Sequence, residues 1–414
     1  MTSADGNSGL AIAFSGGGFR ATLFHLGVAR RLLELGLLDR TEFISGTSGG
    51  AIFAAYLLSK WPKEVAWTAA HFEREVQRSL LEAITKRNFR MSFLWRTVGW
   101  AAIFPLYLIL HPNLAEQLFM KEIFGNQGMD ALPKRPQIFL NTTELRTGTS
   151  FRFTQSKMSS YWDGPVNYAD PGVKVPTVAA AVAASAAFPI MFRDQKISLP
   201  NRDGHPSSVR LVDGGIYDNL AVEPFLKREF DRKHFIVISD AGYPADHTWR
   251  PRLPYVSEFA RLRNIGLAQA DNIRRRWIFE SLSIGHRRGC FVRLSSSARA
   301  IAKLQDAGGD PNMTDYPEGL PEEVVKDLAK VRTDLDRFSE SEAALISFHG
   351  YTLMDACLLK FHAALRSAPP RFDGIWAGLN RIGSDQGWRN WAERVLAASG
   401  SRWGRRTDPV RPAI

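Results

Sequence analysis

The sequence predicts an α/β fold with a mainly parallel sheet and helices on both of its faces, followed by a largely helical C-terminal region. Residues 10–60 alternate short apolar runs typical of buried strands with longer runs of helical spacing. A glycine-rich segment follows each of the first two strand-like runs, and the chain becomes helical in pattern from about Pro321. Of 414 residues, 45% are hydrophobic and 23% charged, which is typical of a large folded core.

The first four elements are expected within residues 10–60. The run LAIAF at 10–14 predicts a buried parallel strand. A helix follows from Ala21, and Gly36 stands where its C-terminal cap is expected. TEFIS at 41–45 predicts the second strand, and AIFAAYLLSK at 51–60 predicts the next helix. This order is a βαβ unit, which makes the strands parallel and brings both glycine-rich loops to the carboxyl edge of the sheet.

Later elements follow from similar runs. Further strands are predicted at 137–141, 151–154, 209–213, 234–239 and 290–294. The alanine-rich run at 177–188 predicts a helix whose small side chains allow a neighbouring element to approach closely. No internal repeat or linker-like stretch divides the chain. We expect a core over residues 9–242 with a variable insertion at 61–135, a mainly helical extension at 243–400, and a flexible basic tail at 401–414.

Charge and cysteine content narrow the classes of partner and compartment. Lys and Arg number 53 against 42 Asp and Glu, an excess that suits anionic lipid, acidic partners or nucleic acid, or that serves only as a solvated basic surface. No basic strand with interleaved aromatics or recognition-helix motif is present, so nucleic acid is not expected. Cys290 and Cys357 lack metal-ligand spacing, which suits a reducing compartment. The N-terminus lacks the pattern of a secretory signal peptide, so a cytoplasmic location is expected.

The segment Gly46-Thr47-Ser48-Gly49-Gly50 fits the pattern G-x-S-x-G of a nucleophile elbow. In such an elbow a serine occupies a strained turn from strand to helix, which exposes its hydroxyl at the top of the sheet. The predicted strand before it and helix after it are the context that the motif requires. The alternative is an ordinary glycine-rich turn in which the serine caps the helix.

The segment from Ser15 to Arg20 is a second glycine-rich loop after a strand. Its consecutive glycines, Gly16, Gly17 and Gly18, allow several backbone amides to point toward one oxyanion. A nucleotide-phosphate loop is the functional alternative, but no Lys-Ser/Thr pair follows, and the second strand lacks a terminal acid for a ribose. A tight turn with no function is the other alternative.

A serine nucleophile needs a base, and no histidine stands out for this role. His205 lies in a polar loop, His234 begins a strand, and His25 within the first helix is expected to be a packing or surface residue. Asp213-Gly214-Gly215 directly follows a predicted strand, and its glycines allow another loop to approach closely. Asp213 is therefore the candidate base, with a simple aspartate turn as the alternative.

Together these three motifs resemble the patatin-like phospholipase family, and SGGGFRA resembles the form of the loop found in cytosolic phospholipase A2. The stretches FLNTTELRTGTSFRF at 139–153 and ASAAFPIMF at 184–192 also resemble parts of patatin domains. The resemblance covers about residues 9–242. It departs at Ala21, where many plant-type members have glycine and the phospholipase A2 form tolerates alanine.

The resemblance implies roles for individual residues. Ser48 matches the nucleophile and Asp213 the base of a Ser-Asp dyad. Gly16, Gly17 and Gly18 match the oxyanion hole, and Arg20 matches a basic residue that holds the loop or a phosphate. Supporting roles fall to Gly46, Gly49, Gly50, Gly214 and Gly215.

The implied activity is hydrolysis of phospholipid acyl esters through an acyl-enzyme, with no cofactor and no metal. The implied enzyme is a serine-dependent carboxylic ester hydrolase of the phospholipase A or lysophospholipase type. The alternatives are acyl transfer, hydrolysis of neutral lipids or small esters, and a catalytically silent lipid-binding module. The oligomeric state stays open.

Residues 93–110, FLWRTVGWAAIFPLYLIL, are unusually apolar. Arg96 and Pro105 interrupt them, which leaves an apolar part shorter than a membrane span needs, and a transmembrane helix, a buried core helix and interfacial docking are the alternatives. Trp95, Trp100 and Tyr107 suit the level of lipid headgroups. Lys86, Arg87 and Arg90 lie just upstream, and Arg274, Arg275 and Arg276 beside Trp277, with Arg287 and Arg288, offer a second basic contact. We therefore expect peripheral membrane association.

Overall fold

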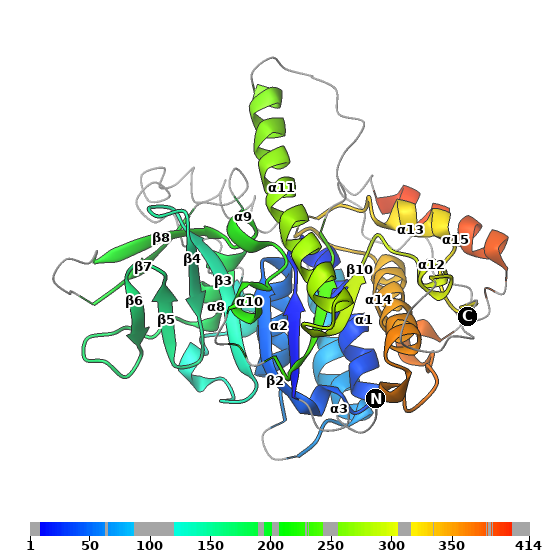
Figure 1. Cartoon of the computed structure of the whole chain (residues 1–414), viewed down its shortest axis with the longest axis horizontal. Helices are drawn as coiled ribbons and strands as arrows, with labels where there is room; N and C mark the ends of the chain where they lie inside the picture. The colour runs from blue at the N-terminus through cyan, green and yellow to red at the C-terminus, as the bar shows by residue number, and fades with distance from the viewer. Residues whose placement is uncertain are drawn as a thin grey trace.

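The computed structural model describes the chain between residues 9 and 399 (Figure 1). The description leaves out residues 63–64, 87–119, 189–193, 201–206, 228–229, 231, 243–255, 305–315, 334, 378, 380–381 and 383. The apolar segment 93–110 and the basic tail 401–414 lie outside the described residues, so the expectations for them stay predictions.

Within the described residues, ten strands form one mixed sheet. Its parallel half has the order β10-β9-β1-β2-β3, formed by β1 (Leu10–Phe14), β2 (Thr41–Thr47), β3 (Gln137–Glu144), β9 (Phe235–Asp240) and β10 (Arg288–Arg293). Its antiparallel half continues from β3 through β4 (Ser150–Phe153), β5 (Lys157–Ser160) and β6 (Gly164–Asn167), with β8 (Ser208–Asp213) also paired to β3 and β7 (Gln195–Ser198) paired to β8.

Helices cover both faces of the parallel half. On one face, Ile12 and Phe14 of β1 belong to the larger apolar core with α1 (Gly18–Glu34), α2 (Gly49–Ser59), α8 (Val178–Ser185) and α14 (Glu340–Phe361). On the other face, Ala11 and Ala13 pack with residues of α10 (Glu223–Leu226) and α11 (Val256–Ser283). Burial on both faces explains why β1 is apolar throughout and does not alternate with polar residues.

Shorter helices complete the described chain. They are α3 (Ala69–His71), α4 (Ser79–Lys86), α9 (Gly215–Asp218), α12 (Ala298–Ala302), α13 (Glu322–Leu328) and α15 (Asp385–Ser399), with a π-helical segment at Phe72–Arg78. Single 3-10 turns lie at Leu38–Arg40, Met129–Ala131, Ala363–Leu365 and Gly374–Trp376. No helix within the described ranges is long and apolar enough to span a bilayer.

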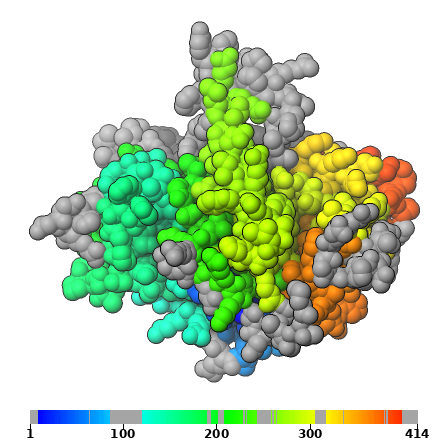
Figure 2. All heavy atoms as spheres, in the orientation of Figure 1, coloured from blue at the N-terminus to red at the C-terminus, as the bar shows by residue number. Residues whose placement is uncertain are grey.

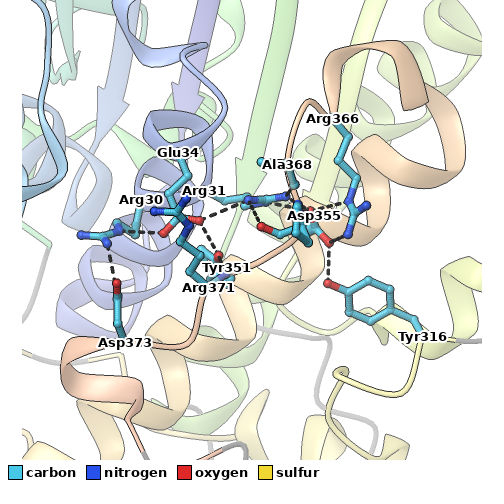
Figure 3. A network of polar contacts seen from close by, with 11 residues as sticks. Arg30, Arg31, Glu34, Tyr316, Tyr351, Asp355, Arg366, Ala368, Arg371 and Asp373 are labelled. Carbon is cyan, nitrogen blue, oxygen red and sulfur yellow. Dashed lines mark hydrogen bonds and ion pairs between the residues drawn. The ribbon is translucent and has the colours of Figure 1, made fainter.

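The helical C-terminal region packs directly on the βαβ unit. A Cβ at Gly27 of α1 would overlap the carbonyl oxygen of Ser347 in α14, so the two backbones touch at their crossing. Figure 3 shows a polar network beside this crossing. There the Arg31 guanidinium donates to the buried Asp355 carboxylate at 2.7 Å, and Asp355 also accepts from the hydroxyl of Tyr316. The C-terminal helices therefore share one core with α1.

The predicted fold class is confirmed, and so are the predicted strands and the helix at 177–188 to within a few residues. Phe14 pairs with Gly46, so both glycine-rich loops leave the sheet at the same level, as the βαβ unit predicts. The sequence did not predict β5, β6 and β7, nor the direction of β8, which runs antiparallel to β3. The predicted domain boundaries stay predictions.

Candidate active site

Ser48 forms a sharp corner between β2 and α2. Its backbone has φ 53° and ψ −120°, and Ala221 is the only other non-glycine residue of the described chain with a positive φ. Such a conformation strains a residue that carries a Cβ. Although Ser48 occupies the N-cap position of α2, its side chain makes no capping hydrogen bond. The alternative of a helix-capping serine is therefore wrong, and the corner has the geometry of a nucleophile elbow.

The glycine-rich loop lies against this elbow. A Cβ at Gly16 would stand 3.2 Å from the Cβ of Ser48, and a Cβ at Gly49 would overlap the Gly18 carbonyl. Gly17, with φ 140°, is the N-cap of α1, and Gly18 is its first residue. Amides at these positions have no acceptor within the helix, and they lie at the positive end of its dipole. The amide of Gly16 instead donates to the carbonyl oxygen of Asn219 at 2.9 Å.

Asp213 is the last residue of β8 and is almost completely buried. Its Oδ1 accepts a hydrogen bond from the Gly215 amide at 2.7 Å. Burial raises the pKa of Asp213 to about 6, and hydrogen bonds from the Gly215 amide and the Ser48 hydroxyl offset part of this rise. The Asp213 carboxylate is therefore a stronger base than an ordinary aspartate, and the Ser48 hydroxyl favours its charged form.

The strand that ends at Asp213, β8, runs antiparallel to its neighbour β3. In the register of the sheet, Thr47 pairs with Asn141 of β3, and Asp213 pairs with the neighbouring Thr142. Because β2 runs parallel to β3 and β8 antiparallel to it, the two strands approach the same level from opposite ends. The prediction that Asp213 ends a strand is confirmed, and the direction of this strand, which the sequence did not predict, is antiparallel to β3.

Three residues that the sequence analysis did not single out hold the elbow and the loop. The Ser48 amide donates to the Ser185 hydroxyl at 2.9 Å, and this hydroxyl donates to the Asn141 carbonyl oxygen at 2.6 Å. The Asn141 side-chain amide donates to the carbonyl oxygen of Gly46 at 3.1 Å. Asn219 accepts from Gly16, as described above. Ser185 and Asn141 lie within the two stretches that resemble patatin domains, which is the sequence signal that points to them.

His25 is a core residue. Its ring is buried, Nδ1 lies 2.7 Å from the Ser239 hydroxyl, and Nε2 lies 2.9 Å from the carbonyl oxygen of Ser15. Burial lowers the pKa of His25 to about 4, so the ring is neutral at pH 7. His234 instead pairs with Glu42 at 3.0 Å, and His205 lies outside the described residues.

The basic side chains after residue 270 do not all face outward as expected. Arg275 is buried and pairs with Asp240 at 2.9 Å. Arg274 stacks over the Tyr217 ring at 5.2 Å, while Arg276 and Trp277 are exposed. The expectation that Arg275 takes part in a second basic contact with lipid is thus wrong. Arg276 and Trp277 are exposed, as such a contact requires.

Residues 12–226 match the model of a protein family described as patatin-like phospholipase, and this match spans more than half of the chain. The chain belongs to the patatin-like phospholipase family. The matched region contains the elbow, the glycine-rich loop and Asp213. A comparison with curated proteins finds no matching sequence.

Solved structures with a related arrangement include two of human GIVD cytosolic phospholipase A2. One has 13% sequence identity and a TM-score of 0.47, and the match covers 87% of this chain and 59% of that chain. The other, in complex with methyl gamma-linolenyl fluorophosphonate, has 15% identity and a TM-score of 0.47 over 94% of this chain and 60% of that chain. VipD from Legionella pneumophila has 14% identity and a TM-score of 0.34 over 96% and 81%. The patatin-like chain thus spans about three fifths of the human enzyme.

Proposed function

We propose that this patatin-like protein hydrolyses fatty-acyl esters of phospholipids, with Ser48 as nucleophile and Asp213 as its base. One observation carries the proposal. At a strained elbow, Ser48 lies beside a buried carboxylate whose pKa is raised to about 6 and whose charged form the Ser48 hydroxyl stabilises. A nucleophile within reach of a base matched to neutral pH is the arrangement that acyl transfer to serine requires.

In the first half of the proposed reaction, Ser48 Oγ attacks the carbonyl carbon of the ester while Asp213 takes the hydroxyl proton. The carbonyl oxygen becomes an oxyanion, which we assign to the amides of Gly17 and Gly18 at the N-terminus of α1. Gly16 keeps a packing role, because its amide is engaged with Asn219. The bond to the alcohol then breaks, and Asp213 returns the proton to the leaving alkoxide. The acyl group stays on Ser48.

In the second half, water attacks the acyl-enzyme and Asp213 accepts a proton from it. Collapse of the second tetrahedral intermediate breaks the bond to Ser48 Oγ, which recovers its proton from Asp213, and the fatty acid leaves. The same carboxylate thus serves both half-reactions. Acyl transfer differs from hydrolysis only in the acceptor that replaces water.

The test is the hydrolysis of a phospholipid and of a soluble ester by the wild type and by Ser48→Ala and Asp213→Asn. Both variants are expected to lose activity by a factor of roughly 10⁴ or more while remaining folded, because the two groups act as one unit. Ser59→Ala, at the other end of α2, and His234→Asn serve as controls and are expected to retain activity. Release of free fatty acid distinguishes hydrolysis from acyl transfer.

A different result would replace the dyad by a triad. This is the outcome if one histidine variant loses as much activity as Ser48→Ala while Asp213→Asn remains active. Wild-type protein that binds lipid but cleaves no ester would instead favour the silent lipid-binding module.

We further propose that the protein contacts its substrate as a peripheral membrane protein through the exposed side of α11. This helix rises beyond the body of the molecule in Figures 1 and 2. Leu262, Ile273 and Trp277 on α11 are exposed by 67%, 57% and 62%. Arg276 is exposed beside them, which suits an anionic lipid surface. The helix also contacts α9, which begins two residues after Asp213.

A further inference from the structure

Arg20 is a fully buried cation directly behind the glycine-rich loop. It lies in the first turn of α1, which contains no acidic residue. Its Nη1 donates to the carbonyl oxygens of Ala329 at 2.8 Å and Val331 at 2.7 Å, and its Nη2 donates to that of Ala241 at 2.8 Å. All three partners lie beyond the region that matches the family, and two of them lie more than 300 residues away in sequence.

This placement needs compensation, because a cation near the positive end of a helix dipole is unfavourable and burial adds a desolvation cost. The compensation comes from carbonyl groups just past α13, which ends at Leu328, because the C-cap residue Ala329 and Val331 both accept from Nη1. A cation at a helix C-terminus is favourable for the same electrostatic reason. Arg20 therefore joins the N-terminus of α1 to the residues that follow the C-terminus of α13.

The third partner connects Arg20 to the loop itself. The Ala241 carbonyl oxygen that accepts from Arg20 lies 2.8 Å from where a Cβ of Gly17 would stand. The Ala241 amide donates to the Ser15 hydroxyl at 2.7 Å, at the start of the loop. Ala241 is thus bound to Arg20 through its carbonyl oxygen and to Ser15 through its amide. Because Arg20 holds this carbonyl group, Arg20 determines how closely Ala241 approaches Gly17.

We infer that Arg20 is a positioning residue that ties the glycine-rich loop to residues 329–331, so that the helical C-terminal region forms part of the catalytic unit. The inference rests on the proposed function, because it assumes that Gly17 and Gly18 bind the oxyanion. It also resolves the two roles that the sequence left open for Arg20. A buried guanidinium that donates to three carbonyl groups holds the loop rather than a phosphate.

The test compares Arg20→Lys and Arg20→Ala with the wild type on a phospholipid and on a soluble neutral ester. A loop that is out of position loses transition-state stabilisation, so kcat falls by roughly 100-fold in Arg20→Ala with little change in KM. The loss is expected to be equal on both substrates. Arg20→Lys keeps the charge but not the planar set of donors, and it is expected to recover part of kcat.

Arg31→Lys is the matched control. Arg31 is also fully buried in α1 and also ties it to the C-terminal region, through Asp355 and the Ala368 carbonyl, but it lies three turns from the loop. Arg31→Lys is expected to lower the melting temperature and to keep kcat within about twofold of the wild type below that temperature. An equal loss of kcat in both lysine variants would reduce Arg20 to a general stabilising residue and overturn the inference.

Hydrogen exchange gives a readout that does not need turnover. In Arg20→Lys, the amides of residues 15–21 and 329–331 are expected to exchange faster than in the wild type, while those of β3 do not change. Unchanged exchange overturns the tether, and a loss of activity confined to the phospholipid assigns Arg20 to the headgroup and overturns it as well. Wild-type protein that is inactive on both esters would instead overturn the proposed function, with the exchange result still testing the tether.

Discussion

In the proposed mechanism, Asp213 serves activity at the expense of stability. Its carboxylate is buried and has a pKa raised to about 6, mainly because burial disfavours the charged form. The folded protein therefore holds a proton on this group over a pH range where the unfolded chain has already lost it. Stability from this group is fully present below a pH of about 4 and is lost as the pH rises through about 6.

Asp213→Asn is therefore expected to be inactive and more stable than the wild type at pH 7–8. The shift from 3.8 to about 6 corresponds to at most about 3 kcal/mol in the free energy of unfolding. This gain is expected to disappear at pH 4, where both proteins are neutral at this position. Urea unfolding at the two pH values measures it, and a variant less stable than the wild type at pH 8 contradicts it.

The same pKa predicts the pH dependence of wild-type activity. Because the base acts when ionised, kcat/KM is expected to rise with pH through about 6 and to level off above pH 7. The measurement is a pH–rate profile on a soluble ester. A profile that continues to rise through pH 7–9 would assign the base to another group.

At the scale of single residues, the sequence predicted those features that depend on only a few neighbouring positions. Ser48, Gly17 and Asp213 lie in motifs whose backbone demands can be read within a few residues. The amide of Gly16 could not be assigned in this way, because its acceptor, Asn219, is brought there by the fold. The partners of Arg20 likewise depend on α13, which no local pattern connects to the loop.

Among the elements, α1 of the family region and α14 of the C-terminal region cross with their backbones in contact. This crossing requires glycine on both sides. A Cβ at Gly27 would overlap the Ser347 carbonyl, and one at Gly350 would overlap the Phe24 carbonyl. Since the obstructing atoms belong to helix backbones, a larger side chain cannot be accommodated by a change of rotamer, and the helices must move apart.

Gly27→Ala is accordingly expected to destabilise the protein by about 3 kcal/mol or more, in spite of the better helix propensity of alanine. Gly266→Ala in α11 is the control, because a Cβ there meets nothing within 4 Å. That variant is expected to be neutral or stabilised by roughly 0.5–1 kcal/mol. Urea unfolding curves measure both, and equal stability of the two variants would contradict the close crossing.

For the helices and strands, the hydrophobic pattern of the sequence predicts some features and not others. β1, α1, β2 and α2 follow from apolar runs in the sequence, and β1 is buried on both of its faces. The direction of β8 does not follow, because an apolar run such as VRLV fits a parallel or an antiparallel neighbour equally well. The strands β5 and β6 contain many polar residues, such as KMSS at 157–160, and give no clear alternation.

For the whole molecule, charge and shape point to a lipid surface. The formal net charge is +11, and α11 projects from the body (Figures 1 and 2). Leu262, Ile273 and Trp277 are exposed along it, with Arg276 beside them. From Leu262 to Trp277 these side chains extend over about 22 Å of helix. This length allows several to contact one surface at the same time. Each arginine near an anionic bilayer contributes about 1 kcal/mol, within a Debye length of about 8 Å at physiological salt.

The protein is therefore expected to sediment with anionic phospholipid vesicles and to be released largely by 1 M salt, which shortens the Debye length to about 3 Å. Ile273→Ser with Trp277→Ala is expected to weaken vesicle binding by roughly tenfold or more while sparing hydrolysis of a soluble ester. Val65→Ser is the control. Val65 is 73% exposed, and it precedes α3, which lies at the opposite end of the molecule from the free end of α11 in Figure 1.

Three outcomes would contradict this surface, each for a different physical reason. Unchanged binding of the Ile273 and Trp277 variant would remove α11 from the contact and leave residues 93–110, with Trp95 and Trp100, to be tested next. Retention through 1 M salt and carbonate would indicate an integral segment, because burial in hydrocarbon is not screened by ions. Absence of sedimentation at any lipid composition would mean that the exposed side of α11 does not bind lipid, however well its charge fits an anionic bilayer.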